Sequence, residues 1–447
     1  MKAIVTDKKI VLVGLGKTGL SCVRYLHSLG KQMTVMDTRK APPGLDELTK
    51  NYPDIRYSLG GLDQEQLNSA NEIILSPGVA LSTPEVKTAS DNGVFIRGDI
   101  DLFAEAASAP IVAITGSNGK STVTTLLGEM AQKCGLNVGV GGNLGVPALD
   151  LLSESIDLYV LELSSFQLET THNLNATSVV LLNLSEDHMD RYTSKFAYLQ
   201  AKQRVFRGAK NIVVNDDEPL SSPLVNKSMR LIHYGLGAQD LEKFSLLTKG
   251  NDRYLAKGFE ILIPVSELKI RGEHNLSNAL AALALGSSVG LKMPEMLQAL
   301  REFKGLVHRC QFVRSVEGVE FFNDSKGTNP GSVVTALSSL GKEISGRIVL
   351  IAGGDAKGAD LSSLYEPVKD FVKALVLIGV DAGKFEAFLQ PIVPVYKESS
   401  MKNAVKKAKA IAENGDLVLL SPACASVDMF KNFEHRGEVF MEEVMLL

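Results

Sequence analysis

The sequence has few cysteines, and their spacing excludes the compact frameworks that cysteines build. Each of the four lies more than 100 residues from the next: Cys22, Cys134, Cys310 and Cys424. A metal knuckle or a disulfide framework needs cysteines close together in a short segment. We therefore expect reduced thiols, as in a cytoplasmic protein.

Long apolar runs and an excess of one charge are also absent. No stretch approaches the roughly 20 apolar residues of a membrane-spanning helix, and Lys8 and Lys9 precede the first short apolar run. The 51 acidic and 47 basic residues give a net charge of -4 with no long run of either sign. This balance favours neither nucleic acid nor a membrane as a partner, and we expect a monomer that binds anions at local sites.

The 447 residues are 45% hydrophobic, and short apolar runs alternate with helical stretches. This alternation predicts an α/β protein with parallel sheets covered on both faces. We expect three domains, at residues 1–98, 99–305 and 306–447; the segment 236–270 has strand-like alternation but no clear assignment. The expected strands include Glu72–Leu75, Ile111–Ile114, Leu158–Leu163, Val179–Leu182, Asn211–Val214, Arg347–Ala352, Lys373–Ile378 and Asp416–Leu420.

The most informative segment is a glycine-rich turn, Gly116–Thr122, between an apolar run and the helix expected over Val123–Met130. Such a turn points backbone N–H groups and the positive end of a helix dipole at one spot, which suits a polyphosphate. Lys120 would reach the outer phosphates, and Ser121 or Thr122 would hold a magnesium ion.

This segment meets the pattern G-x-x-x-x-G-K-[ST] only in part, because the first glycine would fall on Ile114. The turn is therefore a shortened variant of the phosphate-binding loop. An ordinary strand-to-helix connection without a ligand is the alternative interpretation.

A second glycine turn, Gly14–Gly19, follows the apolar run that ends at Val13. It has the form G-x-G-x-x-G, and Asp37 follows 18 residues after Gly19, where an acid that binds a ribose is expected. The pattern fits a dinucleotide such as NAD, but it fits any nucleotide diphosphate equally, and a turn without a ligand stays possible.

Polar residues gather at the ends of the apolar runs between the phosphate loop and residue 205, where open parallel sheets bind their ligands. Glu162 directly follows a buried run and suits magnesium. The segment Asn183–Tyr192, which includes His188, is dense in ionisable and amide groups, and Gly141–Asn143 is a further short loop. Taken alone, Asn183–Tyr192 also fits a charged surface turn. His188 also fits a helix-capping residue or a core residue.

Together these motifs resemble the Mur ligase family over essentially the whole chain. The match includes Glu162–Gln167, Asp187–Tyr192, Gly272–Asn275, His308–Arg309, Asn323–Asn329, Gly353–Lys357 and Ser421–Ser426, besides the Asn143 loop and the phosphate loop. The carboxy-terminal segments resemble the branch of the family that adds D-glutamate. Where the usual motif reads Ser-Lys-Ala-Thr-Asn, this chain has Gly327 in the middle.

The resemblance implies a Rossmann-like amino-terminal domain, a central P-loop ATPase-like sheet and a Rossmann-like carboxy-terminal domain. It implies ATP-dependent addition of D-glutamate to UDP-N-acetylmuramoyl-L-alanine, by way of an acyl phosphate and a tetrahedral intermediate, in cytoplasmic peptidoglycan precursor synthesis. The cofactors would be ATP and two magnesium ions. The amino-terminal turn would then bind the UDP end of the substrate and not NAD.

The same resemblance implies the residues of each site. The UDP substrate would contact Leu15, Thr18, Asp37, Thr38, Ser76, Pro77, Gly78 and Asn143. ATP would contact Gly116, Ser117, Asn118, Gly119, Lys120, Ser121, Thr122, Asn275, Arg309, Asp324 and Lys326. Catalysis would depend on Lys120, Glu162, His188 and Lys202, of which the last three, with Ser121, would bind metal. D-glutamate would contact Thr328, Lys357, Ser426, Val427 and Phe433.

Several of these residues have plain local alternatives. Lys202 is carbamylated in the family, but its sequence context also fits a solvated helix lysine. Lys357 follows a pair of glycines and could be a turn lysine, and Phe433 could fill the core. A nicotinamide oxidoreductase and a regulatory P-loop ATPase are the two other classes of protein that the two turns allow.

Overall fold

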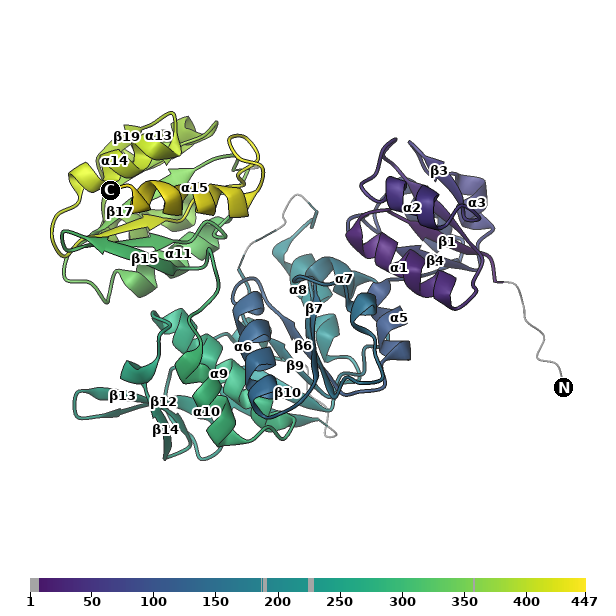
Figure 1. The fold of residues 1–447 in the computed structure, drawn as a ribbon, viewed down its shortest axis with the longest axis horizontal. Helices are drawn as coiled ribbons and strands as arrows, with labels where there is room; N and C mark the ends of the chain where they lie inside the picture. Colours follow the sequence, from purple (N-terminus) through teal and green to yellow (C-terminus); the bar gives the residue numbers. More distant parts are fainter. Residues whose placement is uncertain (1–7, 186, 188–190, 224–228, 357) are drawn as a thin grey trace. The chain divides into compact units, whose positions relative to one another are not determined.

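The computed structural model describes residues 8–185, 187, 191–223, 229–356 and 358–447. Within them the chain forms three sheets, which can be followed by colour from purple through teal to yellow in Figure 1. By compactness it divides into two units. The first comprises Met1–Leu184, Asp190–Pro264 and Asn278–Leu300, and the second Ser185–Met189, Val265–Ser277 and Arg301–Leu447.

The first sheet has five parallel strands in the order β3-β2-β1-β4-β5, the arrangement of half a Rossmann fold. Its central strand β1 is buried on both faces: Ile10 and Leu12 pack with helices α1 and α2, and Val11 and Val13 with α3 and α4. The elements are β1 Ile10–Val13, α1 Lys17–Ser28, β2 Met33–Asp37, α2 Leu45–Asn51, β3 Arg56–Leu59, α3 Gln64–Asn68, β4 Glu72–Leu75, α4 Pro84–Asp91 and β5 Phe95–Arg97.

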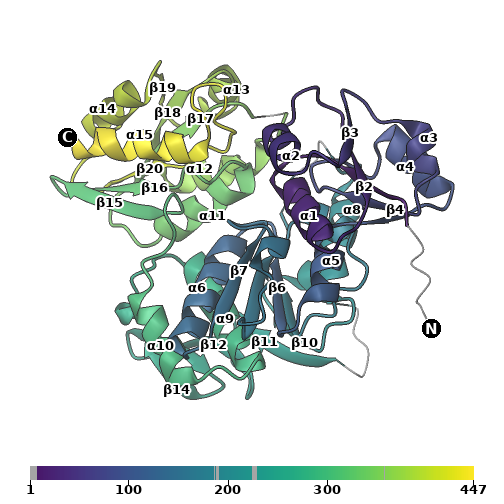
Figure 2. The ribbon, with the colours of Figure 1, turned by 45° about the vertical axis from the view of Figure 1, so that its right-hand side comes forward.

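The second sheet has nine strands in the order β14-β13-β12-β11-β10-β9-β6-β8-β7. Figure 2 labels β6 and α6, the next helix along the chain, in this sheet. Its main elements are α5 Asp99–Ala106, β6 Ile111–Thr115, α6 Lys120–Lys133, β7 Val138–Gly142, β8 Leu158–Glu162, α7 Ser165–Glu169, β9 Ser178–Leu181, α8 Lys195–Gln203, β10 Asn211–Asn215, β11 Arg230–Tyr234, β12 Phe244–Lys249, β13 Asp252–Lys257, β14 Glu260–Pro264, α9 Glu273–Ser288 and α10 Met293–Glu302.

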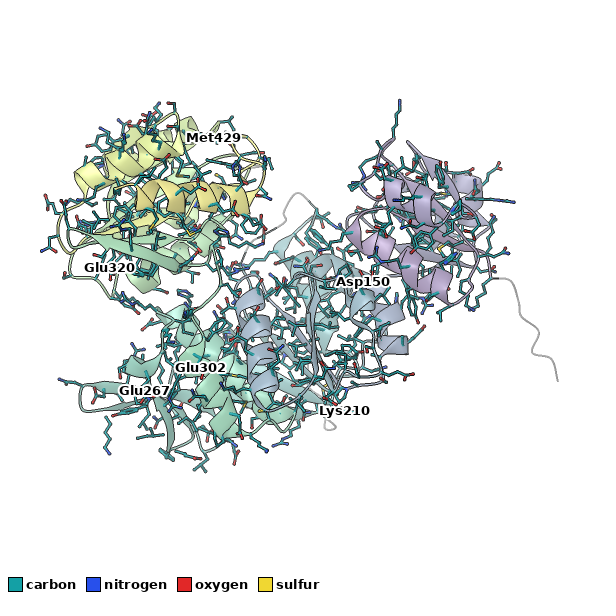
Figure 3. The ribbon with its side chains drawn as sticks, viewed as in Figure 1. Asp150, Lys210, Glu267, Glu302, Glu320 and Met429 are labelled. Atoms are coloured by element: carbon teal, nitrogen blue, oxygen red, sulfur yellow. The ribbon has the colours of Figure 1, made fainter. Side chains whose placement is uncertain are left out.

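The first two sheets share one compact unit because a single hydrophobic core joins them. Residues of α1, such as Val23, belong to the same buried cluster as Phe103 of α5 and Leu149 of the short 3₁₀ helix Ala148–Leu151. Asp150 of that helix, labelled in Figure 3, accepts hydrogen bonds from Ser21 and Arg24 of α1 at 3.0 and 2.6 Å. The limits expected at residues 98 and 305 stay predictions, since this division does not test them.

The third sheet has six strands in the order β15-β16-β20-β17-β18-β19, and all neighbouring pairs are parallel except β15 and β16. Helices α11, α12 and α13 cover one face, and α14 and α15 pack together on the other. The elements are β15 Gln311–Val316, β16 Val319–Asn323, α11 Pro330–Leu340, β17 Ile348–Gly353, α12 Tyr365–Phe371, β18 Val372–Ile378, α13 Ala382–Leu389, β19 Val395–Lys397, α14 Met401–Ile411, β20 Leu417–Leu420 and α15 Phe433–Met445.

The eight apolar runs expected as strands all form strands, and their ends agree within one residue. The unassigned segment 236–270 contains β12, β13 and β14, an antiparallel extension at one edge of the second sheet. The helix expected from Val123 begins earlier, at Lys120, because Gly119 adopts a left-handed conformation (φ 83°) and starts the helix at once. Within the described residues, no helix is long and apolar enough to cross a membrane.

The turn after β1 brings the backbone of Gly19 close to that of Gly14. An ideal Cβ at Gly19 would lie 1.9 Å from the carbonyl oxygen of Gly14, whereas a Cβ at Gly16 would meet nothing within 4 Å. Gly19→Ala should therefore lower the free energy of unfolding of the first unit by about 2 kcal/mol, although alanine is the better helix former. Thermal or urea unfolding followed by circular dichroism measures this loss.

Gly16→Ala is the matched control, because it changes the same turn without a clash and should cost less than about 1 kcal/mol. Equal stability of the two variants would contradict the close packing between Gly19 and Gly14.

Candidate active site

The first glycine turn is held by a buried carboxylate. Asp37, at the end of β2, is 2% exposed and accepts the N–H of Leu15 at 2.7 Å and the guanidinium of Arg39 at 2.7 Å. Burial alone would raise the pKa of Asp37, but the hydrogen bonds from Arg39 and Leu15 lower it below its ordinary value. The Asp37 carboxylate thus fixes the turn that precedes α1.

Seven of the eight residues expected to bind the UDP substrate lie at the carboxyl ends of β1, β2 and β4 or just after them, Asp37 as the last residue of β2 and Thr18 in the first turn of α1. These strands are neighbours in the sheet, so their carboxyl ends share one edge. Leu15, Asp37 and Ser76 are buried, Thr18 and Pro77 half-buried, and Thr38 and Gly78 exposed. The eighth, Asn143, follows β7 of the second sheet and is bonded to Glu162.

The phosphate loop, Gly116–Thr122, is fixed through its backbone. Asn183, at the end of the neighbouring strand β9, accepts the N–H of Ser117 at 3.0 Å on its main-chain oxygen and that of Asn118 at 2.8 Å on its side chain. Its amide also donates to the Asn118 carbonyl at 3.1 Å. The Ser117 hydroxyl lies 3.1 Å from that of Tyr198 in α8. The first half of the loop is thereby tied to β9 and α8, and α6 begins directly after it.

Two lysines converge on one carbonyl oxygen of this loop. Lys120 Nζ donates to the oxygens of Gly116 and Ser117 at 2.8 Å each, and Lys202 Nζ donates to Gly116 at 2.8 Å. Lys202 is 1% exposed, so the interpretation as a solvated helix lysine was wrong. The signal was present in the sequence, because Tyr198 and Lys202 stand four residues apart and so share one face of α8, which is buried.

Glu162 has the environment expected of a metal ligand. Its side chain is 3% exposed, and Oε1 accepts the Asn143 amide at 2.6 Å. Oε2 is buried and, among the described residues, has no hydrogen-bond partner. A buried carboxylate oxygen without a donor is costly, and a cation satisfies it directly or through water. This oxygen therefore fits a magnesium ion, the ligand that the sequence predicts there.

The other expected metal ligands give less support for a metal site. His188 lies outside the described residues, and Ser121 is buried at the start of α6. Within the described part of the chain, no group of three His, Cys, Asp or Glu side chains is arranged to hold a metal.

In the second unit, the loops after β16 and β20 lie side by side around Asp324. The Asp324 carboxylate accepts the N–H of Cys310 at 3.2 Å and the hydroxyl of Ser421 at 2.6 Å. Burial raises the pKa of Asp324 to about 6, and the Ser421 hydroxyl is the strongest opposing influence. A Cβ at Gly327 would lie 2.5 Å from Asp324 Oδ2, so the absence of a side chain there leaves room for this carboxylate.

The structure brings an expected ATP ligand and an expected D-glutamate ligand together. Lys326 Nζ lies 3.6 Å from the centre of the Phe433 ring, at the start of α15. The Ser325 hydroxyl donates to the Phe433 carbonyl at 2.8 Å. Of the other expected ligands in this unit, Ser426 is buried, Asn275 and Arg309 are half-buried, and Thr328 and Val427 are exposed. Lys357 lies outside the described residues.

Arg436 is a residue of this site that sequence reasoning missed. It is 1% exposed, and its guanidinium donates to the carbonyl oxygens of Ser325 at 2.8 Å and Cys424 at 3.1 Å, which ties the two loops together. Burial lowers its pKa to about 10. Its position could have been recognised, because Arg436 stands four and eight residues before Phe440 and Val444 on the buried stripe of α15.

Backbone strain gathers at the same place. Five described residues other than glycine have positive φ, and three of them flank the Asp324 loop: His308 (64°), Cys310 (42°) and Ala423 (59°). Each such conformation costs about 1 kcal/mol or more and persists where the surrounding structure imposes it, commonly at functional sites. The strain makes this edge of the third sheet a candidate ligand site.

Three family models cover most of the chain. The Mur ligase MurD-like N-terminal domain matches residues 8–98, the Mur ligase middle domain residues 114–286, and the Mur ligase glutamate ligase domain residues 308–424. The chain belongs to the Mur ligase family. The α/β fold with Rossmann-like outer sheets, expected from the sequence, is confirmed.

Similar proteins match this Mur ligase from end to end. The UDP-N-acetylmuramoylalanine–D-glutamate ligase of Marinobacter nauticus is 53% identical over 440 residues, 98% of each chain. The protein of the same name from Pseudomonas savastanoi pv. phaseolicola is 52% identical over 447 residues, 100% of each chain. In fold, the UDP-N-acetylmuramate–alanine ligase of Thermotoga maritima is similar with a TM-score of 0.60 at 19% identity, over 98% of this chain and 99% of that one.

The Ser421–Asp324 hydrogen bond predicts that the stability lost in the Ser421→Ala variant depends on pH. Because the pKa of Asp324 is raised from its ordinary value of 3.8 to about 6, the protonated acid favours folding below about pH 4, and this contribution is lost as the pH rises through 6. Ser421→Ala removes the donor that serves the charged form. It should cost about 2 kcal/mol at pH 8 and clearly less at pH 5, as measured by unfolding at the two pH values.

Ser362→Ala is the matched control, since Ser362 donates to Asp360 at 2.6 Å in a similar pair that is exposed to solvent. It should cost little at either pH. A loss for Ser421→Ala that is the same at pH 5 and pH 8 would show that the charge of Asp324 is not involved.

Proposed function

We propose that this Mur ligase joins D-glutamate to UDP-N-acetylmuramoyl-L-alanine and converts ATP to ADP and phosphate, a step in peptidoglycan precursor synthesis. The observation that carries the proposal is the identity of 52–53% over nearly all of the chain to ligases named for this reaction. The match to the Pseudomonas savastanoi protein covers the whole chain, and so every residue proposed for the sites. The enzyme acts as a monomer in the cytoplasm, without nucleic acid or membrane as a partner.

The first sheet holds the UDP end of the substrate. Its turn after β1 leads into the amino terminus of α1, whose N–H groups and dipole favour a diphosphate. Gly78 is exposed, and a Cβ there would meet nothing within 4 Å, so its backbone is accessible to a ligand. Thr18, Thr38 and the Ser76–Gly78 loop add contacts to the same edge.

The second sheet holds the ATP phosphates at Gly116–Thr122, with Lys120 moving from the loop carbonyls to the outer phosphates. Glu162 Oε2, Ser121, His188 and a carbamylated Lys202 hold magnesium, for which we propose two ions. Carbamylation replaces a cation by an anion beside Lys120, where two ammonium groups otherwise share the Gly116 carbonyl. The magnesium ions, when bound, neutralise charge on the transferred phosphoryl group.

The second unit supplies the remaining ligands. Asn275, Arg309, Asp324 and Lys326 contact the nucleotide, and Thr328, Lys357, Ser426, Val427 and Phe433 contact D-glutamate. Lys326 Nζ lies close to the Phe433 ring, which supports adjacent sites for the nucleotide and D-glutamate. The Lys326 ammonium group can then interact with both of these anions.

The chemistry explains why these parts are needed. A carboxylate is a poor electrophile, so the muramoyl-alanine carboxylate first takes the γ-phosphoryl group of ATP and becomes an acyl phosphate, with release of ADP. The uncharged amine of D-glutamate attacks this acyl carbon, and phosphate leaves the tetrahedral intermediate while the new amide nitrogen gives up a proton to solvent. Phosphoryl transfer depends on positioning and charge neutralisation, which lysines and backbone N–H groups provide.

The proposal predicts strict dependence on all substrates. ADP release should require ATP, UDP-N-acetylmuramoyl-L-alanine and D-glutamate together, which a coupled assay with each component omitted measures directly. L-glutamate, L-alanine and a diamino acid should not replace D-glutamate. ATP turnover without the UDP substrate would favour a regulatory ATPase, and activity with another amino acid would contradict the assignment of D-glutamate.

Lys120→Ala should separate the two nucleotide sites. Because Lys120 serves only the ATP phosphates, the variant should lose turnover by at least about 100-fold, in the range for a charged group that stabilises the transition state. Calorimetry should find the UDP substrate bound with an affinity within about threefold of the wild type. Loss of both properties would mean that the two sites are not independent.

A further inference from the structure

Arg191 makes contacts that its place in the sequence does not reveal. It stands three residues after His188, but its own side chain is directed to other parts of the first unit. Nη1 donates to the carbonyl oxygen of Pro77 at 2.7 Å, and Nη2 pairs with the Glu169 carboxylate at 2.7 Å. The guanidinium carbon lies 4.0 Å from the centre of the Phe166 ring. The side chain is 12% exposed, so these contacts define its position.

The contact with Pro77 determines where the next N–H group points. The described chain has no cis peptide bond, and in a trans peptide the C=O and the following N–H point in opposite directions. Arg191 binds the Pro77 oxygen, so the N–H of Gly78 is directed away from the guanidinium. Gly78 is the exposed residue of this loop, with open space where a side chain would be.

The remainder of the loop is fixed by its own backbone. Ser76 N–H donates to Val13 at the end of β1 at 2.9 Å, and Val79 N–H donates to Ser76 at 2.9 Å. Arg191 therefore holds the Pro77–Gly78 peptide, whose orientation these bonds leave open, and its Nη2 adds a longer hydrogen bond to the Val79 carbonyl oxygen at 3.4 Å.

The other contacts of Arg191 lead to the second sheet. Phe166 and Glu169 belong to α7, the helix that starts three residues after Glu162. The guanidinium thus joins the loop after β4 to the helix that follows the predicted magnesium ligand.

One detail argues against a purely stabilising role. The Nε–H of Arg191 is buried and has no hydrogen-bond partner among the described residues. An unsatisfied buried donor is a cost, which a residue retained only for stability would not be expected to carry. The orientation of the guanidinium instead serves the Pro77 and Glu169 contacts.

We propose that Arg191 is a positioning residue for the UDP substrate: it orients the Pro77–Gly78 peptide so that its N–H faces the diphosphate, and it ties this loop to α7. The inference rests on the proposed binding of UDP at the first sheet. Arg191 thus acts through the loop and not by contact with the UDP substrate.

The test compares Arg191→Ala with Arg204→Ala in the full-length enzyme. Arg204 is the matched control, because it also binds α7, through the Glu169 carbonyl oxygen, and is bonded to no residue of the 76–79 loop. Arg191→Ala should weaken binding of UDP, measured by calorimetry, and raise the KM for the UDP substrate by about tenfold, the effect of losing one well-placed hydrogen bond to a charged group. The KM values for ATP and D-glutamate should stay within about twofold.

Arg191→Lys keeps the charge but cannot serve both carbonyl and carboxylate, so it should recover only part of the UDP affinity. Unchanged UDP affinity in Arg191→Ala, or an equal change in Arg204→Ala, would overturn the inference. If the wild type binds UDP but shows no D-glutamate-dependent ADP release, the proposed function fails, while the UDP measurement still decides the role of Arg191.

Discussion

The bonds to the backbone of the phosphate loop are the interactions on which this active site depends. Lys120 and Lys202 bind the Gly116 carbonyl, and Asn183 binds Ser117 and Asn118, so the loop is braced from its own helix, from α8 and from β9. A loop held in this way enters directly into α6, whose N–H groups and dipole then face a polyphosphate. The Asn183 bonds involve neither lysine, so they hold the loop backbone when Lys120 turns to the phosphates.

The three sheets hold their acidic site residues in the same way. In each, short polar loops follow buried parallel strands, and a glutamate or aspartate at or near the strand end is fixed by hydrogen bonds: Asp37 in the first sheet, Glu162 in the second and Asp324 in the third. Their environments differ in a way that fits their proposed roles. Asp37 and Asp324 have donors to both carboxylate oxygens, whereas Glu162 has one oxygen without a donor among the described residues, which suits a metal ligand.

The strands and the family were predictable from the sequence because buried parallel strands are apolar runs, and because motifs keep their order along the chain. The antiparallel extension β12–β14 was not assigned, since its strands are partly exposed and carry no strong apolar run. The burial of Lys202 and Arg436 was missed, although helical spacing places each on an apolar face. The contacts of Arg191 with Pro77 and Glu169 join segments far apart in sequence, and no local pattern encodes them.

In the proposed function, two glycine turns of one chain bind two different nucleotides, the first as an anchor and the second as the source of energy. A crystal structure of the enzyme with UDP-N-acetylmuramoyl-L-alanine and a non-hydrolysable ATP analogue would decide this. We expect uridine diphosphate at the carboxyl ends of β1, β2 and β4, and the triphosphate at Gly116–Thr122. Adenine bound at the first turn, or an empty phosphate loop at saturating analogue, would contradict it.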